Sequence, residues 1–501
     1  MIDRRWLLLS GLVVVGLTGC FHDDDDDNDF PGEIDFAQRP DFLVGEISQN
    51  TFQVPDNDLL TAGLGLDGLM AAAPGYDDPT DPTLGELRRN TLYNNYRALM
   101  DPTSAGGFGR LYGPNVDNPV DPDQGLIPGT EYIAYADAGD GVQTVTHMIQ
   151  VPDHFDPNNP CIVTGTSSGS RDIYGAIGTS GEWGLKRGCA VAYTNKGTGT
   201  GFHLLGPDLG YGMRGQLIDA DDPQVSFRAD LTDQERQAFL AGFPHRVATQ
   251  HAHSQLNSEA DWGRYTLQAI RFAFYVLNRQ FADQQGGEPF EPDNTLVIGS
   301  SVSNGGGAAL RALEQDTLGL IDGVAVSEPN VQPLPGRDFT IRQGDDAPIG
   351  PGEHSKSLLD YTTFIALYQP CANLGQPVDL LPTLAGFLPR EVAENRCTSL
   401  AEKGLLEADT LEGRIAEAQR RINDYAIPEA QNPAQASVAT FVSPEAISVT
   451  YANQYGLFGV EDRFCDFSFA ATDANGAPTA LGDAAASVLF AVSNGIPPTG
   501  G

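Results

Sequence analysis

Hydrophobic and polar positions alternate in the middle of the chain in a pattern typical of strands and helices. Two stretches alternate polar and apolar residues as antiparallel strands do, Glu131-Tyr-Ile-Ala-Tyr135 and Gln143–Val151. A third apolar stretch, Cys161-Ile-Val-Thr164, precedes the glycine-rich Gly165-Thr-Ser-Ser-Gly-Ser170 and then another strand, Cys189-Ala-Val-Ala-Tyr193. This order of strand, glycine loop, helix and strand predicts a βαβ unit.

Helical spacing of apolar residues is found on both sides of this unit. Leu84–Met100 predicts one helix within a region rich in Pro, Gly and Asp, and Trp262–Arg279 predicts another. After it, Ile321–Val326 predicts a further parallel strand. Alternating strands and helices of this kind indicate an α/β fold built on a mostly parallel sheet.

The alternation stops between about residue 330 and residue 445. Amphipathic helices are predicted there over Leu358–Tyr368 and Ala401–Tyr425, joined by Pro-rich loops. An insertion at this point is typical of a lid, which excludes water from an active site and shapes its pocket. We therefore expect a core over residues 41–501 with a large helical lid insertion at about 330–445.

One segment turns sharply from a strand into a helix. Thr295–Ile298 is apolar and mostly β-branched, Ala308–Glu314 favours a helix, and mostly small residues lie between them. A serine at such a turn has an exposed hydroxyl, and the residues two positions away must be small. Ser303 fits, with Ser301 before it and Gly305 after it. The usual motif has Gly where Ser301 stands, and Ser tolerates positive φ less well than Gly.

Two other interpretations of this segment stay open. It could be an ordinary strand, loop and helix, or a loop that cradles phosphate. The phosphate interpretation is weak, because the third residue after Gly307 is Leu310 and no Gly-Lys-Ser/Thr follows. Ser303 as a nucleophile is the interpretation that we prefer.

Several long motifs resemble one family, the D-(−)-3-hydroxybutyrate oligomer hydrolases. The first is Ser301-Val-Ser-Asn-Gly-Gly-Gly-Ala-Ala-Leu-Arg-Ala312, which resembles the family's active-site segment. The others are Cys161–Ala176, His251-Ala-His-Ser-Gln255, Ala260-Asp-Trp-Gly-Arg264 and Tyr451-Ala-Asn-Gln-Tyr-Gly456. The resemblance covers most of the chain from about residue 40. It implies hydrolysis of short 3-hydroxybutyrate oligomers to monomer during polyhydroxybutyrate degradation, with no metal or organic cofactor.

The alternation of strands and helices around the strand-to-helix turn at Ser303 indicates an α/β-hydrolase-like fold with Ser303 as the nucleophile. In that fold the backbone N–H after the nucleophile, here that of Asn304, helps to bind the tetrahedral oxyanion. A second N–H comes from the loop after an earlier strand, for which Ser167, Ser168 and Gly169 are the candidates. Gly197-Thr-Gly-Thr-Gly201 is a second glycine loop, and either loop could instead be a simple turn.

The amino terminus predicts export. Residues 1–20 combine two arginines, a short apolar run and Leu17-Thr-Gly-Cys20, which resembles the lipobox of bacterial lipoproteins. Lipid on Cys20 would anchor the protein at the outer membrane or cell surface, and a plain secretory signal for an extracellular protein is the alternative. The aspartate-rich residues 21–40 predict a solvated tether.

Charge and cysteine content restrict the possible partners. A net charge of −38 excludes nucleic-acid binding through a basic face, and no protein partner can be identified. It also repels anionic substrates at long range, so local arginines should matter for a carboxylate. After Cys20 five cysteines remain, an odd number. We expect Cys371 to pair with Cys397, whereas Cys161 and Cys189 could simply be buried.

The catalytic base is not evident from the sequence. A serine nucleophile needs a histidine and a carboxylate, which in α/β-hydrolases follow it in the chain. Of eight histidines only His354 follows Ser303, and it lies at the start of the predicted lid. We therefore expect the acid and base beyond Gly501, so that the core is incomplete at its carboxyl end. An upstream base is the alternative, with candidates His154, His203 and His251.

Other functions remain possible at this stage. A tannase-like or feruloyl esterase-like exported enzyme would have the same nucleophile, and a hydrolase-like binding lipoprotein would lack turnover. His251 and His253 could be two metal ligands, but no further ligands stand at recognisable spacing, so a structural role is favoured. The sequence thus predicts an exported serine esterase without a metal.

Overall fold

A computed structural model describes most of the chain. The described residues are 34–100, 102, 125–137, 144–281, 289–331, 339–342, 344–350, 358–375, 390–425, 427, 429–432, 444–473 and 477–496. The predicted signal peptide, Cys20 and most of the predicted acidic tether lie outside them, as does His354.

The larger sheet has seven strands in the order β1-β2-β3-β5-β4-β10-β11. In that order the strands are Leu43–Phe52, Gly129–Asp137, Thr144–Pro152, Ala190–Thr194, Cys161–Thr166, Leu296–Val302 and Gly323–Ser327. Neighbours from β1 to β5 are antiparallel, and those from β5 to β11 are parallel. The expectation of a mostly parallel sheet is therefore confirmed only in part: the sheet is mixed, because β1, missed in the sequence, adds a further antiparallel pair to those made by β2 and β3.

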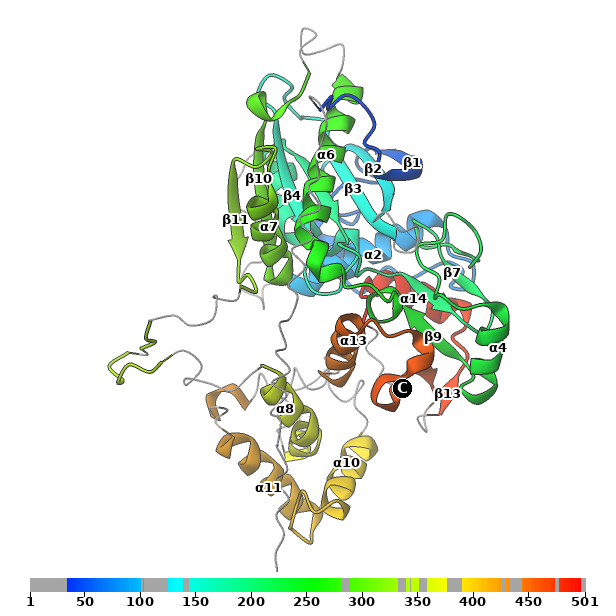
Figure 1. Cartoon of the computed structure of the whole chain (residues 1–501), viewed down its shortest axis with the longest axis vertical. Helices are drawn as coiled ribbons and strands as arrows, with labels where there is room; N and C mark the ends of the chain where they lie inside the picture. Colours follow the sequence, from blue (N-terminus) through cyan, green and yellow to red (C-terminus); the bar gives the residue numbers. More distant parts are fainter. Residues whose placement is uncertain are drawn as a thin grey trace, which may run out of the picture. The chain divides into compact units, whose positions relative to one another are not determined.

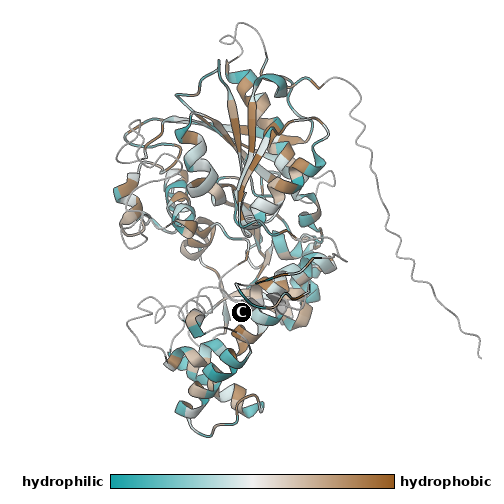
Figure 2. Cartoon of the chain, turned by 90° about the vertical axis from the view of Figure 1, so that its left-hand side faces the viewer, coloured by the Kyte–Doolittle hydropathy of each residue, from teal (hydrophilic) through white to brown (hydrophobic). Residues whose placement is uncertain are grey.

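Helices bury both faces of this sheet. On one face α6 (Trp262–Phe281) packs its aromatic and aliphatic side chains against the strands, beside α7 (Ser303–Gln315) (Figure 1). The other face is covered by α2 (Leu84–Leu99) and by the segment around α3 (Glu182–Lys186). Figure 2 shows the hydrophobic strands between these layers. The predicted strands and helices of the core are thus confirmed to within a few residues.

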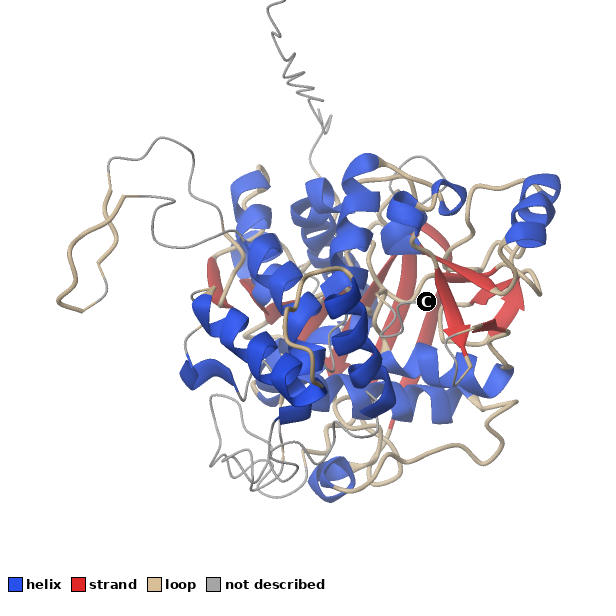
Figure 3. Cartoon of the chain, turned by 90° about the horizontal axis from the view of Figure 1, so that it is seen from below, coloured by secondary structure: helices blue, strands red, loops and turns tan. Residues whose placement is uncertain are grey.

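A second sheet was not predicted from the sequence. Its six strands are antiparallel in the order β13-β12-β9-β6-β7-β8. In that order they are Pro478–Thr479, Phe469–Thr472, Arg246–Thr249, Phe202–Leu204, Leu209–Tyr211 and Leu217–Asp219. Strands this short do not show a clear alternation of apolar and polar residues. Figure 3 shows both sheets in red among the blue helices.

The segment predicted as a lid contains helices that pack on one another. They are α8 (Leu358–Ala372), α10 (Arg390–Glu402) and α11 (Leu411–Asp424), and the disulfide Cys371–Cys397 lies in their common core. The single helix expected over Ala401–Tyr425 is wrong. Gly404 has a φ of +69°, and the Thr410 hydroxyl accepts a hydrogen bond from Gly413 N–H, so one helix ends and another begins. A lid function for this segment stays a prediction.

The remaining helical elements lie outside the two sheets, the helices that cover the larger sheet and the helices of the predicted lid. The α-helices are α1 (Gly65–Met70), α4 (Asp233–Gly242), α5 (Gln250–His253), α13 (Pro444–Gly456) and α14 (Asp483–Val492). A π-helix spans Ile177–Gly181, and the 3₁₀ turns are Ile173–Ala176, Ser258–Asp261, Pro292–Asn294, Asn373–Gly375, Glu429–Gln431, Val460–Asp462 and Phe464–Asp466. No helix in the described part of the chain is both long and apolar enough to cross a membrane.

The cysteines form a second disulfide that the sequence did not predict. Cys161 and Cys189 are bonded to each other rather than simply buried, and they tie the start of β4 to the residue before β5. These two strands are neighbours in the sheet, so the βαβ unit brings the two cysteines together. Cys465 is an exposed free thiol, which accounts for the odd number.

Candidate active site

Ser303 occupies a strained turn between β10 and α7. Its φ is +55°, a value that non-glycine residues rarely adopt, and Val302 before it is extended. The side chain of Ser303 is exposed and is not hydrogen-bonded to any described residue. Since β10 pairs with β4 and β11 on either side, the turn is held at a fixed place at the carboxyl end of an interior strand. The predicted sharp turn with an outward serine is therefore present.

The neighbours of Ser303 explain why small residues are needed. Ser301 is buried, and its hydroxyl donates a hydrogen bond of 2.5 Å to the Thr166 carbonyl at the end of β4. A Cβ atom on Gly305 would lie 2.3 Å from the Ser301 hydroxyl oxygen and 2.5 Å from the same carbonyl. Ser301, which stands where the usual motif has Gly, does not have a positive φ and instead ties the turn to β4.

The glycine loop after β4 lies against this turn. The N–H of Gly169 donates to the Asn304 side-chain oxygen at 2.7 Å, so the loop and the residue after Ser303 are in direct contact. The N–H of Ser167 donates to the Thr194 carbonyl at 3.0 Å. The Ser168 N–H has no acceptor among the described residues. Of the three loop residues considered from the sequence, Ser168 is therefore the one that retains a free backbone donor.

Asn304 also connects the turn to α13. Its side-chain nitrogen donates to the Tyr451 hydroxyl at 3.3 Å, and the Tyr451 ring packs edge-on against His251 at 4.9 Å between centroids. On the same helix, Gln454 donates to the Asn257 side-chain oxygen at 2.8 Å. The motifs around Ser167, His251, Ser303 and Tyr451 were recognised separately in the sequence, and the structure brings them together.

No described histidine is hydrogen-bonded to Ser303. In His251, Nδ1 lies 2.8 Å from the Ser170 hydroxyl, and burial together with the nearby Lys196 charge lowers its pKa to about 3. His203 Nε2 bonds to Asp208 at 2.8 Å while its Nδ1 accepts from Ala229 N–H, so both ring nitrogens are occupied. His154 is exposed in the turn after β3. None of the three upstream candidates is hydrogen-bonded to Ser303, and the position of the catalytic base stays a prediction.

His253 caps a helix. Its Nδ1 accepts a hydrogen bond of 3.0 Å from Thr249 N–H, and burial lowers its pKa to about 4. Within the described ranges, no group of three or more His, Cys, Asp or Glu side chains is arranged to hold a metal ion.

Lys196 is a residue of this region that sequence reasoning missed. Its ammonium is buried against the glycine loop and donates to the Gly169 carbonyl at 2.5 Å and to the Ser167 hydroxyl at 3.0 Å. In the sequence it is a single lysine between two polar residues and a glycine loop. No local pattern marks such a lysine as buried.

Comparison with known proteins identifies the family of the chain. The family model of 3HB-oligomer hydrolases matches residues 17–501. The chain belongs to the 3HB-oligomer hydrolase family. Proteins of Polaromonas sp., Azoarcus sp. and Ralstonia pickettii, each named D-(−)-3-hydroxybutyrate oligomer hydrolase, are 48%, 50% and 44% identical to it. The matches cover 93%, 94% and 92% of this chain, and 67%, 68% and 64% of those proteins.

The relatives are named as hydrolases of 3-hydroxybutyrate oligomers, which are esters, so membership of this family makes the chain an ester hydrolase. It spans about two thirds of the length of those relatives. No solved structure matches the chain.

Proposed function

We propose that this protein is an exported serine esterase that hydrolyses 3-hydroxybutyrate oligomers to monomer, with Ser303 as the nucleophile. The observation that carries the proposal is the exposed Ser303 at a φ of +55° between β10 and α7, in a chain of the 3HB-oligomer hydrolase family. A backbone held in this strained region projects the hydroxyl toward a substrate rather than into the core.

The geometry supports a two-step acyl transfer. The Ser303 hydroxyl oxygen attacks the ester carbonyl and loses its proton to a base. The oxyanion that forms is bound by the N–H groups of Asn304 and Ser168, each worth about 3 kcal/mol in the transition state. The bond to the leaving hydroxybutyrate unit then breaks, and that unit takes up a proton. Water hydrolyses the remaining acyl ester on Ser303 and restores the free hydroxyl.

The strand order supports an α/β-hydrolase-like core. Two antiparallel strands, β2 and β3, precede a parallel set in which the chain passes from β4 to β5 on one side and then to β10 on the other. Both Ser303 and the Ser167–Gly169 loop follow the carboxyl ends of adjacent parallel strands, where active sites of open α/β sheets are built.

The substrate proposal is tested by comparing esters. We expect kcat/KM for the linear 3-hydroxybutyrate dimer to exceed that for an aromatic ester, such as methyl ferulate, by about 10- to 100-fold, because a site of the 3HB-oligomer hydrolase family should be shaped for the small branched acyl group. A higher kcat/KM for the aromatic ester would favour the feruloyl esterase-like alternative. Hydrolysis of neither ester by a folded protein would contradict the assignment as an esterase.

Export and lipid attachment are part of the same proposal. Two disulfides among the described residues favour an oxidising compartment, in agreement with the predicted signal sequence. Mass spectrometry of the mature amino terminus is expected to show a diacylated Cys20, and Cys20→Ser should release the protein from the membrane fraction. An unmodified terminus further along the chain would instead indicate plain secretion.

A further inference from the structure

Lys196 is a buried ammonium group that forms no ion pair with a described carboxylate. Its side chain is 0% exposed, and its backbone has a φ of +48°. Three oxygens accept its hydrogen bonds: the Ser167 hydroxyl at 3.0 Å, the Gly169 carbonyl at 2.5 Å and the Thr198 hydroxyl at 3.2 Å. The ring of Trp262 lies 4.9 Å away. Burying a charge without a counter-ion is unfavourable, so the site must be held by the surrounding fold.

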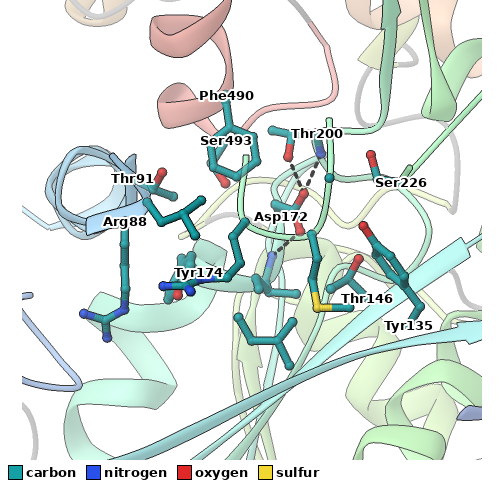
Figure 4. Close-up of a pocket in the computed structure, with 16 residues that line it drawn as sticks. Arg88, Thr91, Tyr135, Thr146, Asp172, Tyr174, Thr200, Ser226, Phe490 and Ser493 are labelled. Carbon is teal, nitrogen blue, oxygen red and sulfur yellow. Dashed lines mark hydrogen bonds between the residues drawn. The ribbon is translucent and has the colours of Figure 1, made fainter. Parts of the chain in front are cut away.

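The three acceptors belong to both glycine loops recognised in the sequence. Ser167 and Gly169 lie in the loop after β4, whereas Thr198 lies in the loop after β5. Asp172, just after the first loop, is also bonded to the second loop. Its carboxylate accepts hydrogen bonds from Thr200 N–H at 2.7 Å and from the Thr200 hydroxyl at 2.5 Å. Figure 4 shows Asp172 and Thr200 facing each other beside a small cavity. At about 30 Å³ that cavity holds only one or two water molecules, so it is not a substrate pocket.

We propose that Lys196 is a positioning residue that fixes the orientation of the Ser168 N–H in the oxyanion site. The ammonium binds the side chain of the residue before Ser168 and the carbonyl of the residue after it, so the loop is held in place on both sides of the Ser168 N–H. With all three of its donors occupied, Lys196 does not bind substrate itself. This inference rests on the proposed function, since it assigns Ser168 as an oxyanion donor.

The charge of Lys196 makes this arrangement pH-dependent. Burial lowers its pKa from 10.5 to about 7, with Glu259 and Asp172 acting to raise it and Arg171 acting to lower it. His251 also faces the ammonium, and its own pKa is depressed to about 3, so it stays neutral in this range. A neutral amine has two N–H donors for three acceptors. The loop should therefore lose one of its bonds as pH rises through about 7.

Activity and stability should respond to this titration in opposite directions. The activity that depends on the ammonium falls as pH rises through about 7. The folded-state pKa lies below the unfolded value of 10.5, so between about 7 and 10.5 the unfolded chain binds more protons than the folded one. The Lys196 contribution to stability is therefore unfavourable below pH 7 and is relieved as pH rises to 10.5. A purely structural lysine would not produce the loss of activity.

Lys196→Met tests the inference. At pH 6.5 we expect kcat for the 3-hydroxybutyrate dimer to fall by about 10- to 100-fold, because a misplaced donor costs most in the transition state, while KM changes little. The fall of kcat/KM with rising pH near 7 should disappear. The matched control is Lys186→Met, which removes another buried lysine, bonded to Glu182 at 2.8 Å. The control should lower stability and keep the wild-type pH profile.

Two further measurements separate failure of the proposed function from failure of the inference about Lys196. Labelling of Ser303 by a phosphonate in the wild type tests the proposed function. Absence of labelling would refute that function but would not concern the contacts of Lys196. If Lys196→Met does not fold, Ser167→Ala removes one acceptor of the ammonium and should move the alkaline fall in kcat/KM to lower pH. The inference is wrong if Lys196→Met keeps the wild-type pH profile, or if Ser167→Ala leaves the profile unmoved.

Discussion

Replacing Ser303 with alanine is expected to lower kcat for oligomer hydrolysis by about 10⁴- to 10⁶-fold. The loss should be this large because the hydroxyl is the proposed attacking atom and no described side chain could take its place at the turn. Stability should change by less than about 0.5 kcal/mol, since the side chain is exposed and alanine at a φ of +55° is strained as serine is. Assays of monomer release measure the change in kcat, and thermal unfolding measures the change in stability.

Ser327→Ala is the matched control for this variant. Ser327 is also an exposed serine at the carboxyl end of a parallel strand, β11, but its φ is not positive and its hydroxyl bonds to Glu328. It should keep full activity and phosphonate labelling, whereas Ser303→Ala loses both. A folded Ser303→Ala protein that still hydrolyses the dimer, or a label found on another residue, would show that Ser303 is not the nucleophile.

The strand-to-helix turn at Ser303 was predictable because its requirements are local. A β-branched strand, a set of small residues and a helix-forming run occupy about twenty consecutive positions. The steric need for Gly305 follows from the turn itself, and the structure adds only which atoms would clash. The position of the Ser167–Gly169 loop was also predictable, because βαβ units place their strands side by side and their loops at one edge.

The contacts made by Lys196 and Tyr451 were not predictable in this way. Tyr451 reaches Asn304 from a helix about 150 residues further along the chain, and nothing between them in sequence specifies that distance. Lys196 is buried only because two loops from different strands close over it. The Cys161–Cys189 disulfide was missed because the predicted βαβ unit places the two strands side by side but does not give their register, which decides whether the two cysteines lie opposite each other.

A buried charged network supports the segment that follows the glycine loop. Glu131 on β2 accepts hydrogen bonds from Arg88 on α2 at 3.2 and 3.0 Å, from the Tyr174 hydroxyl at 2.9 Å and from Gln150 at 2.9 Å. Arg88 also donates to the Asp58 carbonyl at 3.1 Å. Arg88 and Glu131 have only 4% and 1% of their side-chain surfaces exposed. Arg88 and Tyr174 both line the cavity in Figure 4. The network therefore ties α2 and β2 to the turn just after Asp172.

Arg88→Met is expected to destabilise the protein by about 3–5 kcal/mol, because it leaves the Glu131 carboxylate buried without its cation. The matched control is Arg311→Met, whose partner Glu314 is 3.0 Å away with both side chains more than half exposed; that change should cost less than about 1 kcal/mol. Urea unfolding measures both. Because a buried charge is unfavourable only while it is unpaired, adding Glu131→Gln to Arg88→Met should recover part of the loss. An Arg88→Met protein as stable as the Arg311→Met control would mean that the pair contributes little, and that packing alone holds α2 against the sheet.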